Sequence, residues 1–261
     1  MALFLRLLIL LSLGQIWFSN QASIIAIDIF LRYKALPFFS YWDSTNTTWD
    51  YLVLSQSWPP GYCQFMKCAY PRPTIGFNIH GLWAQIWPNQ PMNQCSDGPK
   101  FNNSFIQDIY EQLKKEWADE KHYDNPWKFW HHEWSKHGVC AIKNSEVIKN
   151  QHDYFAISLM LKRMYNFTEI FARNNIVPSN ETYYDTASVL VKIRNDIGAN
   201  VLLHCSWQSG EEARLVEARV CVDKSFKLID CPKESFQIQL LSPIRPLAWT
   251  APCQNDFVFS N

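Results

Sequence analysis

Residues 129–140 read FWHHEWSKHGVC and place three histidines, a glutamate and a lysine close together in the chain. On a helix, Glu133 and His137 are four residues apart and therefore share a face, and Lys136 borders both. We expect a helix over residues 127–136 whose surface brings imidazole, carboxylate and ammonium groups together. Such a cluster suits acid–base chemistry.

Two other interpretations of this helix exist. A zinc protease motif has two histidines four residues apart on one helical face. Here His132 and His137 are five residues apart, so on a regular helix their rings diverge by roughly 140°, which argues against that motif. The other alternative is a solvated charged face, and the bulky side chains of Phe129, Trp130 and Trp134 argue against it.

A further histidine lies in residues 77–83, FNIHGLW, which favour a strand that ends in a turn at Gly81. A single histidine at a strand end is usually structural. Gly81 has no side chain, however, so a substrate could approach the imidazole of His80 closely. Trp83 has two interpretations, a core residue or a platform on which a base stacks, and core is the more common case.

The segments around these two stretches follow a grouped order of strands, then helices, then strands. We expect strands at 51–57, 74–83, 200–204, 213–222 and 227–229, and helices at 104–117, 127–136, 154–171 and 187–197. This order is typical of an α+β fold with an antiparallel sheet at its core and helices around it. Because no repeat or Gly/Ser-rich linker interrupts the chain, we expect a single domain.

The N-terminus is typical of an exported protein. Arg6 precedes an apolar run at 7–13 that is too short to span a bilayer, so residues 1–22 are predicted to be a signal peptide rather than a membrane anchor. The apolar stretch 24–42 contains three charged residues, which argue against a membrane span. The expected organisation is a signal peptide at 1–22, an N-terminal extension at 23–48 and a globular domain at 49–261.

Cysteines and glycosylation motifs also favour the secretory pathway. An even number of cysteines favours four disulfides, and the absence of a C-x-x-C pair argues against zinc ligands. The cysteines are Cys63, Cys68, Cys95, Cys140, Cys205, Cys221, Cys231 and Cys253. The four N-x-S/T motifs, at Asn46, Asn102, Asn166 and Asn180, predict a glycoprotein.

Net charge does not by itself indicate a nucleic-acid partner, because Lys plus Arg and Asp plus Glu are both 24. Two histidines nevertheless suit one reaction well. Cleavage of RNA by its own 2′-hydroxyl needs a base for that proton and an acid for the leaving 5′-oxygen, and imidazole can serve as either near neutral pH. A neighbouring lysine would stabilise the negative charge of the phosphorane, and this chemistry requires no metal.

The segments FNIHGLWA and FWHHEWSKHGVC resemble the two active-site segments of the ribonuclease T2 family of secreted ribonucleases. The resemblance extends from about Trp49 to Cys253 and includes WPPGYC near its start and LVEARVCVD near its end. It implies a ribonuclease domain at 49–261, endoribonuclease activity that forms a 2′,3′-cyclic phosphate, RNA as the substrate, and neither cofactor nor metal. The departures from the family pattern are Asn78, Ala84, Gln85 and Val139, so a base preference does not carry over.

The resemblance also implies roles for individual residues. These are general base for His137, general acid for His80, phosphate binding for His132, transition-state stabilisation for Glu133 and Lys136, and base contact for Trp83 and Phe129. It implies the disulfides Cys63–Cys68, Cys95–Cys140, and Cys221–Cys231 nested inside Cys205–Cys253. The second of these would tie the end of the catalytic helix to the loop beyond His80.

Several biological roles remain open at this point. The eight cysteines and the glycosylation motifs resemble plant S-ribonucleases, which are expressed in the style and reject self pollen, and such a role would imply a pollen-side protein partner. The alternatives are an S-like ribonuclease for phosphate scavenging or defence, and an inactive secreted binding or storage protein, against which the presence of both His80 and His137 argues. We expect a secreted monomer without stable membrane association, with the vacuole as the alternative location.

Overall fold

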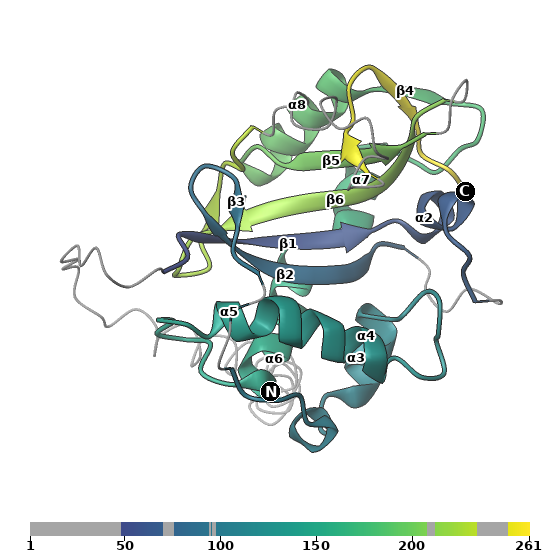
Figure 1. Cartoon of the computed structure of the whole chain (residues 1–261). Helices are drawn as coiled ribbons and strands as arrows, with labels where there is room; N and C mark the ends of the chain where they lie inside the picture. The colour runs from purple at the N-terminus through teal and green to yellow at the C-terminus, as the bar shows by residue number, and fades with distance from the viewer. Residues whose placement is uncertain (1–47, 70–75, 94, 96–97, 208–211, 234–249) are drawn as a thin grey trace, which may run out of the picture. The chain divides into compact units, whose positions relative to one another are not determined.

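A sheet in the order β3-β2-β1-β6-β5-β8 runs through the molecule, and β4, β7 and β9 attach to its strands (Figure 1). The computed structural model describes residues 48–69, 76–93, 95, 98–207, 212–233 and 250–261. The strands are β1 (Tyr51–Ser57), β2 (Asn78–Ile86), β3 (Gln90–Pro91), β4 (Tyr183–Asp185), β5 (Leu202–Ser206), β6 (Arg214–Val222), β7 (Leu228–Ile229), β8 (Ala251–Pro252) and β9 (Asp256–Val258). The main ladders are antiparallel, and Arg214 of β6 pairs in parallel with Val258 of β9.

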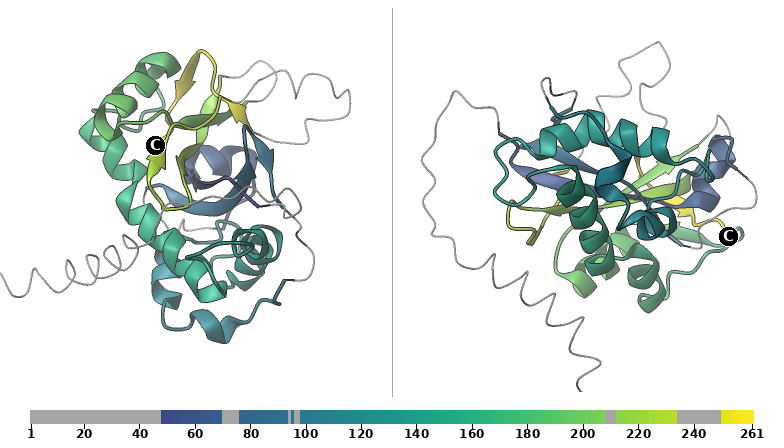
Figure 2. Two further views of the ribbon diagram at one scale, coloured as in Figure 1. Left: turned by 90° about the vertical axis from the view of Figure 1, so that its left-hand side faces the viewer. Right: turned by 90° about the horizontal axis from the view of Figure 1, so that it is seen from below.

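The helices flank this sheet on different sides (Figures 1 and 2). Helices α3, α4 and α6 gather beside the β2 edge, whereas α8 lies beside β5. Their bounds are α2 (Pro59–Phe65), α3 (Tyr110–Glu116), α4 (Trp127–Glu133), α5 (Val139–Ala141), α6 (Gln151–Met164), α7 (Phe167–Arg173) and α8 (Thr186–Ile197), with a 3-10 turn η1 (Asn103–Ile106) and a π-helical turn η2 (Trp134–Gly138). In the described part of the chain, no helix has the length and apolar character needed to cross a membrane.

The predicted α+β class with an antiparallel sheet is confirmed, but two of the predicted helices are divided. The segment 104–117 contains the turn η1 followed by the shorter α3. The segment 154–171 breaks at Asn166, whose side chain accepts a hydrogen bond from the N–H of Thr168 and so caps α7.

One face of β1 and β2 forms the main core against the helices. Its fully buried side chains include Leu52, Leu54, Ile79, Leu82 and Ala84. The hydroxyl of Tyr154 on α6 donates to the carbonyl oxygen of Leu82 at 3.0 Å. Indole groups tie the other helices together, since Trp130 of α4 donates to the carbonyl oxygen of Trp117 at 2.8 Å. These contacts fix the helices against β2.

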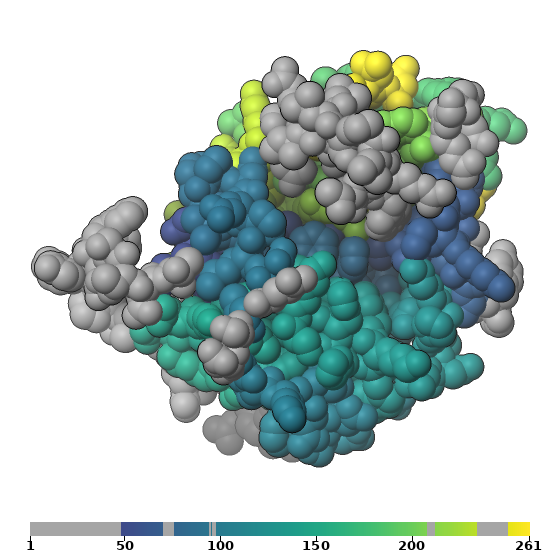
Figure 3. All heavy atoms as spheres, in the orientation of Figure 1, coloured from purple at the N-terminus to yellow at the C-terminus, as the bar shows by residue number. Residues whose placement is uncertain are grey.

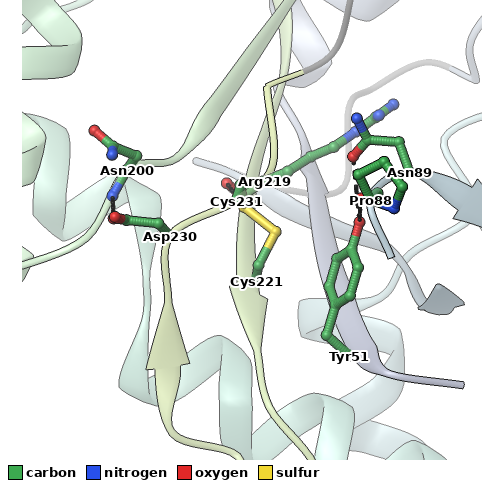
Figure 4. The surroundings of a disulfide bond; sticks show 8 residues. All are labelled: Tyr51, Pro88, Asn89, Asn200, Arg219, Cys221, Asp230 and Cys231. Carbon is green, nitrogen blue, oxygen red and sulfur yellow. Dashed lines mark hydrogen bonds between the residues drawn. A yellow bond between two sulfur atoms is a disulfide. The ribbon is translucent and has the colours of Figure 1, made fainter. Parts of the chain in front are cut away.

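The four disulfides join the predicted pairs, Cys63–Cys68, Cys95–Cys140, Cys205–Cys253 and Cys221–Cys231. Cys140 belongs to α5, so its bond with Cys95 anchors the end of the helix that carries the histidine cluster. The bond between Cys221 and Cys231 lies on the other face of the sheet, in a small apolar cluster with Tyr51 (Figure 4).

Candidate active site

A bulge in β2 determines where His80 points. The register between β1 and β2 shifts by one residue between Gly81 and Ile79, which leaves His80 as an extra residue in the bulge. Because side chains alternate along a strand, the bulge takes His80 off the face of the core residue Leu82 and turns it toward the opposite face. There its Nδ1 lies 2.5 Å from Oε1 of Glu217 on β6.

Glu217 is a buried carboxylate whose second oxygen is also satisfied. Oε2 accepts a hydrogen bond from the hydroxyl of Ser55 at 3.1 Å and from the guanidinium of Arg219 at 2.6 Å. Burial raises the pKa of Glu217, but the charges of Arg219 and His80 outweigh burial and hold that pKa far below its usual range. The carboxylate therefore stays ionised.

The contact between Glu217 and His80 shifts the pKa of His80 in the opposite direction, upward. Burial lowers the pKa of His80, but the charge of Glu217 and its hydrogen bond outweigh burial, so the pKa of His80 is raised. The ring is 28% exposed, and Nδ1 is the nitrogen that faces Glu217. The contact with Glu217 thus favours the protonated form of the His80 imidazole.

The helix with the histidine cluster is not a regular α-helix. Beyond Glu133 it continues as the π-helical turn η2, in which the N–H of Val139 bonds to the carbonyl oxygen of Trp134, five residues earlier. Such a turn brings residues five apart toward the same side of the helix. The roughly 140° expected between the rings of His132 and His137 assumed regular α-helical rotation, which does not continue through η2.

Gly81 makes room for a contact between two candidate residues. A Cβ at this position would lie 2.2 Å from Oε2 of Glu133 and 2.2 Å from Nε1 of Trp83. Those two atoms form a hydrogen bond of 3.1 Å with each other. The glycine is needed by the protein's own side chains, whereas the sequence suggested a role in substrate access. Burial raises the pKa of Glu133 to about 7, so this carboxyl is protonated in mildly acidic solution.

Trp83 lies against both candidate catalytic histidines. The centroid of its ring system is 5.0 Å from that of His80 and 5.5 Å from that of His137. His137 is buried, and its Nδ1 has no hydrogen-bond partner among the described residues. Burial is the main cause that lowers the pKa of His137 to about 3, and the positive charges of Lys136, His80 and His132 add to it. The pKa values of His80 and His137, which flank Trp83, are thus shifted in opposite directions.

The remaining predicted residues complete the helix side of the site. The ring of Phe129 lies 6.2 Å from that of His80. His132 is exposed, Lys136 is half-buried, and burial and the charge of Lys136 lower the pKa of His132. The structure therefore brings all the predicted catalytic and base-contact residues into one region, where η2 packs against β2.

Three residues of the site were not expected from the sequence: Ser55, Glu217 and Arg219. A signal for two of them was present, since the apolar stretch 215–222 has charges at positions 217 and 219, which share a strand face. Charged side chains are rarely fully buried unless they are paired. The sequence could not identify the partner, because Glu217 and His80 are 137 positions apart.

The predicted glycosylation sites differ in their surroundings. Asn102 and Asn180 are exposed, whereas Asn166 is half-buried and caps α7. Asn46 lies outside the described residues, as do the predicted signal peptide and nearly all of the N-terminal extension. Within the ranges that the structure describes, no group of three or more His, Cys, Asp or Glu side chains is placed to hold a metal ion.

Comparison with known proteins assigns the chain to a family. Residues 49–231 match the profile of the Ribonuclease T2 family. Ribonuclease T2 of Danio rerio is 34% identical over 189 residues, which cover 72% of this chain and 75% of the relative. Ribonuclease 1 of Arabidopsis thaliana is 32% identical over 195 residues, which cover 72% of this chain and 83% of the relative.

More distant relatives include both enzymes and a storage protein. A ribonuclease-like storage protein of Panax ginseng is 25% identical over 204 residues, which cover 77% of this chain and 83% of that protein. The solved structure of ribonuclease MC1 from the seeds of bitter gourd superimposes with a TM-score of 0.65 and 25% identity, covering 80% of this chain and 100% of that one. The family match and the ribonucleases above 30% identity together show that this chain belongs to the Ribonuclease T2 family and is an endoribonuclease.

Proposed function

We propose that His137 and His80 cleave RNA as general base and general acid, without a metal, and form a 2′,3′-cyclic phosphate. Neutral His137 removes the proton of the 2′-hydroxyl, and the resulting oxygen attacks phosphorus. Protonated His80 donates its proton to the 5′-oxygen as the bond between that oxygen and phosphorus breaks. Proton exchange with water then returns both imidazoles to their starting states.

The observation that carries this assignment is that Glu217 contacts His80 at 2.5 Å, whereas Nδ1 of the buried His137 has no hydrogen-bond partner among the described residues, so the two pKa values are shifted in opposite directions. In mildly acidic solution, His137, with its pKa lowered to about 3, is neutral and can accept a proton. The pKa of His80 is raised, so His80 holds a proton that it can give away. Environments that push two titratable groups apart in this way are how one site supplies both an acid and a base.

The other residues suit stabilisation of the transition state. Lys136 offers positive charge to the phosphorane, on which negative charge develops, and the imidazole of His132 offers a hydrogen bond. Glu133, with a pKa of about 7, can donate a hydrogen bond in mildly acidic solution, and Trp83 holds it in place. We further propose that Phe129 and Trp83 contact the bases on either side of the scissile phosphate.

Substitution of each histidine tests the assignment. In the presence of a chelator, His80→Ala and His137→Ala should each lower kcat/KM on single-stranded RNA by about 10³-fold, within the range of a lost general acid or base. His152→Ala is the matched control, because His152 lies on α6 and pairs at the surface with Asp108. All variants should keep the wild-type circular dichroism spectrum.

Two outcomes would count against the proposal. A loss of tenfold or less in a folded His80 or His137 variant would mean that the two imidazoles are not the acid and base. Loss of wild-type activity in chelator alone would mean that the reaction depends on a metal.

The remaining proposals concern where the enzyme acts and for what purpose. Four disulfides support export to an oxidising compartment, which glycan analysis of the secreted protein would check at Asn102, Asn166 and Asn180. A style self-incompatibility function stays a prediction that expression confined to the style would support. Induction in phosphate-starved leaves would instead support the scavenging alternative. A storage function, suggested by the Panax ginseng relative, would be supported by a folded wild type that leaves RNA uncut.

A further inference from the structure

Two adjoining hollows lie on the outer side of the helix that carries the histidine cluster. One, of about 430 Å³, is bordered by Lys100, Phe101, His131 and Ser135. The other, of about 550 Å³, is bordered by Lys128, His131, His132, Ser135 and Lys136. They share Cys95, His131 and Ser135, so they form one continuous groove, which we call the outer groove.

The outer groove begins at the proposed catalytic site and leads away from it. His132 and Lys136, which the proposed mechanism places at the scissile phosphate, also line the groove. Lys128 is one helical turn before His132, which places their Cβ atoms on the order of 6 Å apart, close to one nucleotide step along a backbone. The helix side chains that border the groove, Lys128, His131, His132 and Ser135, are exposed, and teal atoms of this part of the chain reach the surface in the space-filling view (Figure 3).

The charge of the groove differs from that of the molecule. The chain as a whole has equal numbers of basic and acidic side chains. The described residues that line the groove include three lysines and two histidines but no carboxylate. Neither Lys100 nor Lys128 forms an ion pair within the described part of the chain, and both side chains are exposed. Concave surfaces lined by one sign of charge attract ligands of the opposite sign.

The wall opposite the helix is held in place. The indole N–H of Trp134 donates to the carbonyl oxygen of Pro99 at 2.8 Å, and the ring of Phe101 meets that of His131 edge-on at 5.7 Å. Cys95, which lines the groove, is bonded to Cys140 of α5. Lys100 therefore sits on a segment that is tied to the helix on both sides.

We propose that the outer groove binds a phosphodiester of the RNA strand beyond the scissile bond, with Lys100 and Lys128 as its cationic contacts. This inference rests on the proposed ribonuclease mechanism, because it requires the strand to pass His132 and Lys136. The groove makes the enzyme prefer longer substrates to a single phosphodiester. It does so without a strongly basic protein, since the positive charge is confined to the path of the strand.

The test compares substrates of different length in the variant Lys100→Ala/Lys128→Ala. On a dinucleoside monophosphate, kcat/KM should stay within about twofold of wild type, because the proposal places both lysines beyond the scissile phosphate. On a longer single-stranded oligonucleotide it should fall about three- to tenfold, and the slope of log Kd against log salt should lose about 0.7 for each lost phosphate contact. The matched control is Lys192→Ala/Lys227→Ala, which removes two exposed lysines outside the groove.

Binding of a 2′-deoxy oligonucleotide separates failure of the groove from failure of the mechanism. This probe lacks the attacking hydroxyl, so its Kd can be measured whether or not the enzyme cleaves RNA as proposed. Weaker binding by the groove variant, with unchanged binding by the control, supports the groove. Equal Kd and salt slope in wild type and groove variant overturn it, as does an equal loss of activity on both substrate lengths. The proposal is also overturned if the groove variant binds a sulfated polysaccharide more weakly than wild type does but binds the oligonucleotide equally well.

Discussion

Glu217 decides which of the two histidines keeps its proton. It lies 2.5 Å from Nδ1 of His80 and is itself held by Ser55 and Arg219. His137 has no such carboxylate partner among the described residues, and burial lowers its pKa to about 3. The proposed assignment of acid and base therefore depends on one buried residue of β6 that is far from both histidines in the chain.

Replacing Glu217 by Gln should shift the pH profile of catalysis in a stated direction. The proposed base, His137, must be neutral, so activity is expected to fall as pH drops toward the lowered pKa of His137. The proposed acid, His80, must be protonated, so activity is expected to fall as pH rises through the raised pKa of His80. Without the carboxylate, burial and Arg219 lower the pKa of His80, and the alkaline limb should move down by about 1–3 pH units.

The measurement for Glu217→Gln is kcat/KM on RNA from about pH 4 to pH 9, where the profile of the free enzyme is read directly. Glu212→Gln is the matched control, because Glu212 also pairs with an arginine two residues on but lies at the surface. An alkaline limb that stays in place in Glu217→Gln, at any level of activity, would show that Glu217 does not set the proton affinity of His80.

At the scale of elements, the sequence predicts the segments well and their irregularities poorly. The strand at 51–57 agrees with β1 because an apolar run is bounded by the two prolines that follow Trp58. The bulge at His80 and the π turn over Trp134–Gly138 have no comparable signal in the amino-acid sequence. Both depend on tertiary packing, and both change which side chains face the site.

The break between α6 and α7 illustrates a local signal that periodicity hides. Apolar residues continue through the break at helical spacing, whereas Asn166 stops the helix by accepting hydrogen bonds from the N–H of Thr168 and from Nζ of Lys162. Asparagine is among the most favourable N-cap residues. Asn166 is also the acceptor residue of a predicted glycosylation motif, so the helix cap and this motif involve the same side chain.

We expect Asn166→Ala to lower the free energy of unfolding by about 0.5–2 kcal/mol, because α7 loses its cap. Asn166→Asp is the matched control: it also removes the glycosylation motif, but its carboxylate can still accept both hydrogen bonds. The difference between these variants in urea unfolding measures the cap without any contribution from a glycan. If both variants lose the same stability, the cap contributes nothing and the cause lies in the glycan or in the amide of Asn166.

At the scale of the whole molecule, the fold holds together residues that the sequence can only list separately. His80 on β2 and the cluster at 132–137 were predicted from motifs, and the disulfide pairs were implied by the family resemblance. The contact of His80 with Glu217 of β6 could not be predicted, because burial of a charge becomes visible only when the sheet is assembled. The near-zero net charge likewise conceals the outer groove, since composition averages over positions that the fold separates.

The disulfides contribute to stability according to the chain that each one closes. Cys205–Cys253 spans 48 positions and Cys221–Cys231 spans 10, and both include a fully buried sulfur in or beside the sheet. In the chain-entropy description, the longer loop stabilises by about 4 kcal/mol and the shorter one by about 3 kcal/mol. Cys205→Ala/Cys253→Ala should therefore lose about 1 kcal/mol more in urea unfolding than Cys221→Ala/Cys231→Ala. Comparing two buried pairs cancels most of the packing cost. A larger loss for the short loop would mean that local packing around Tyr51 and Arg219, rather than chain entropy, governs the contribution of these bonds.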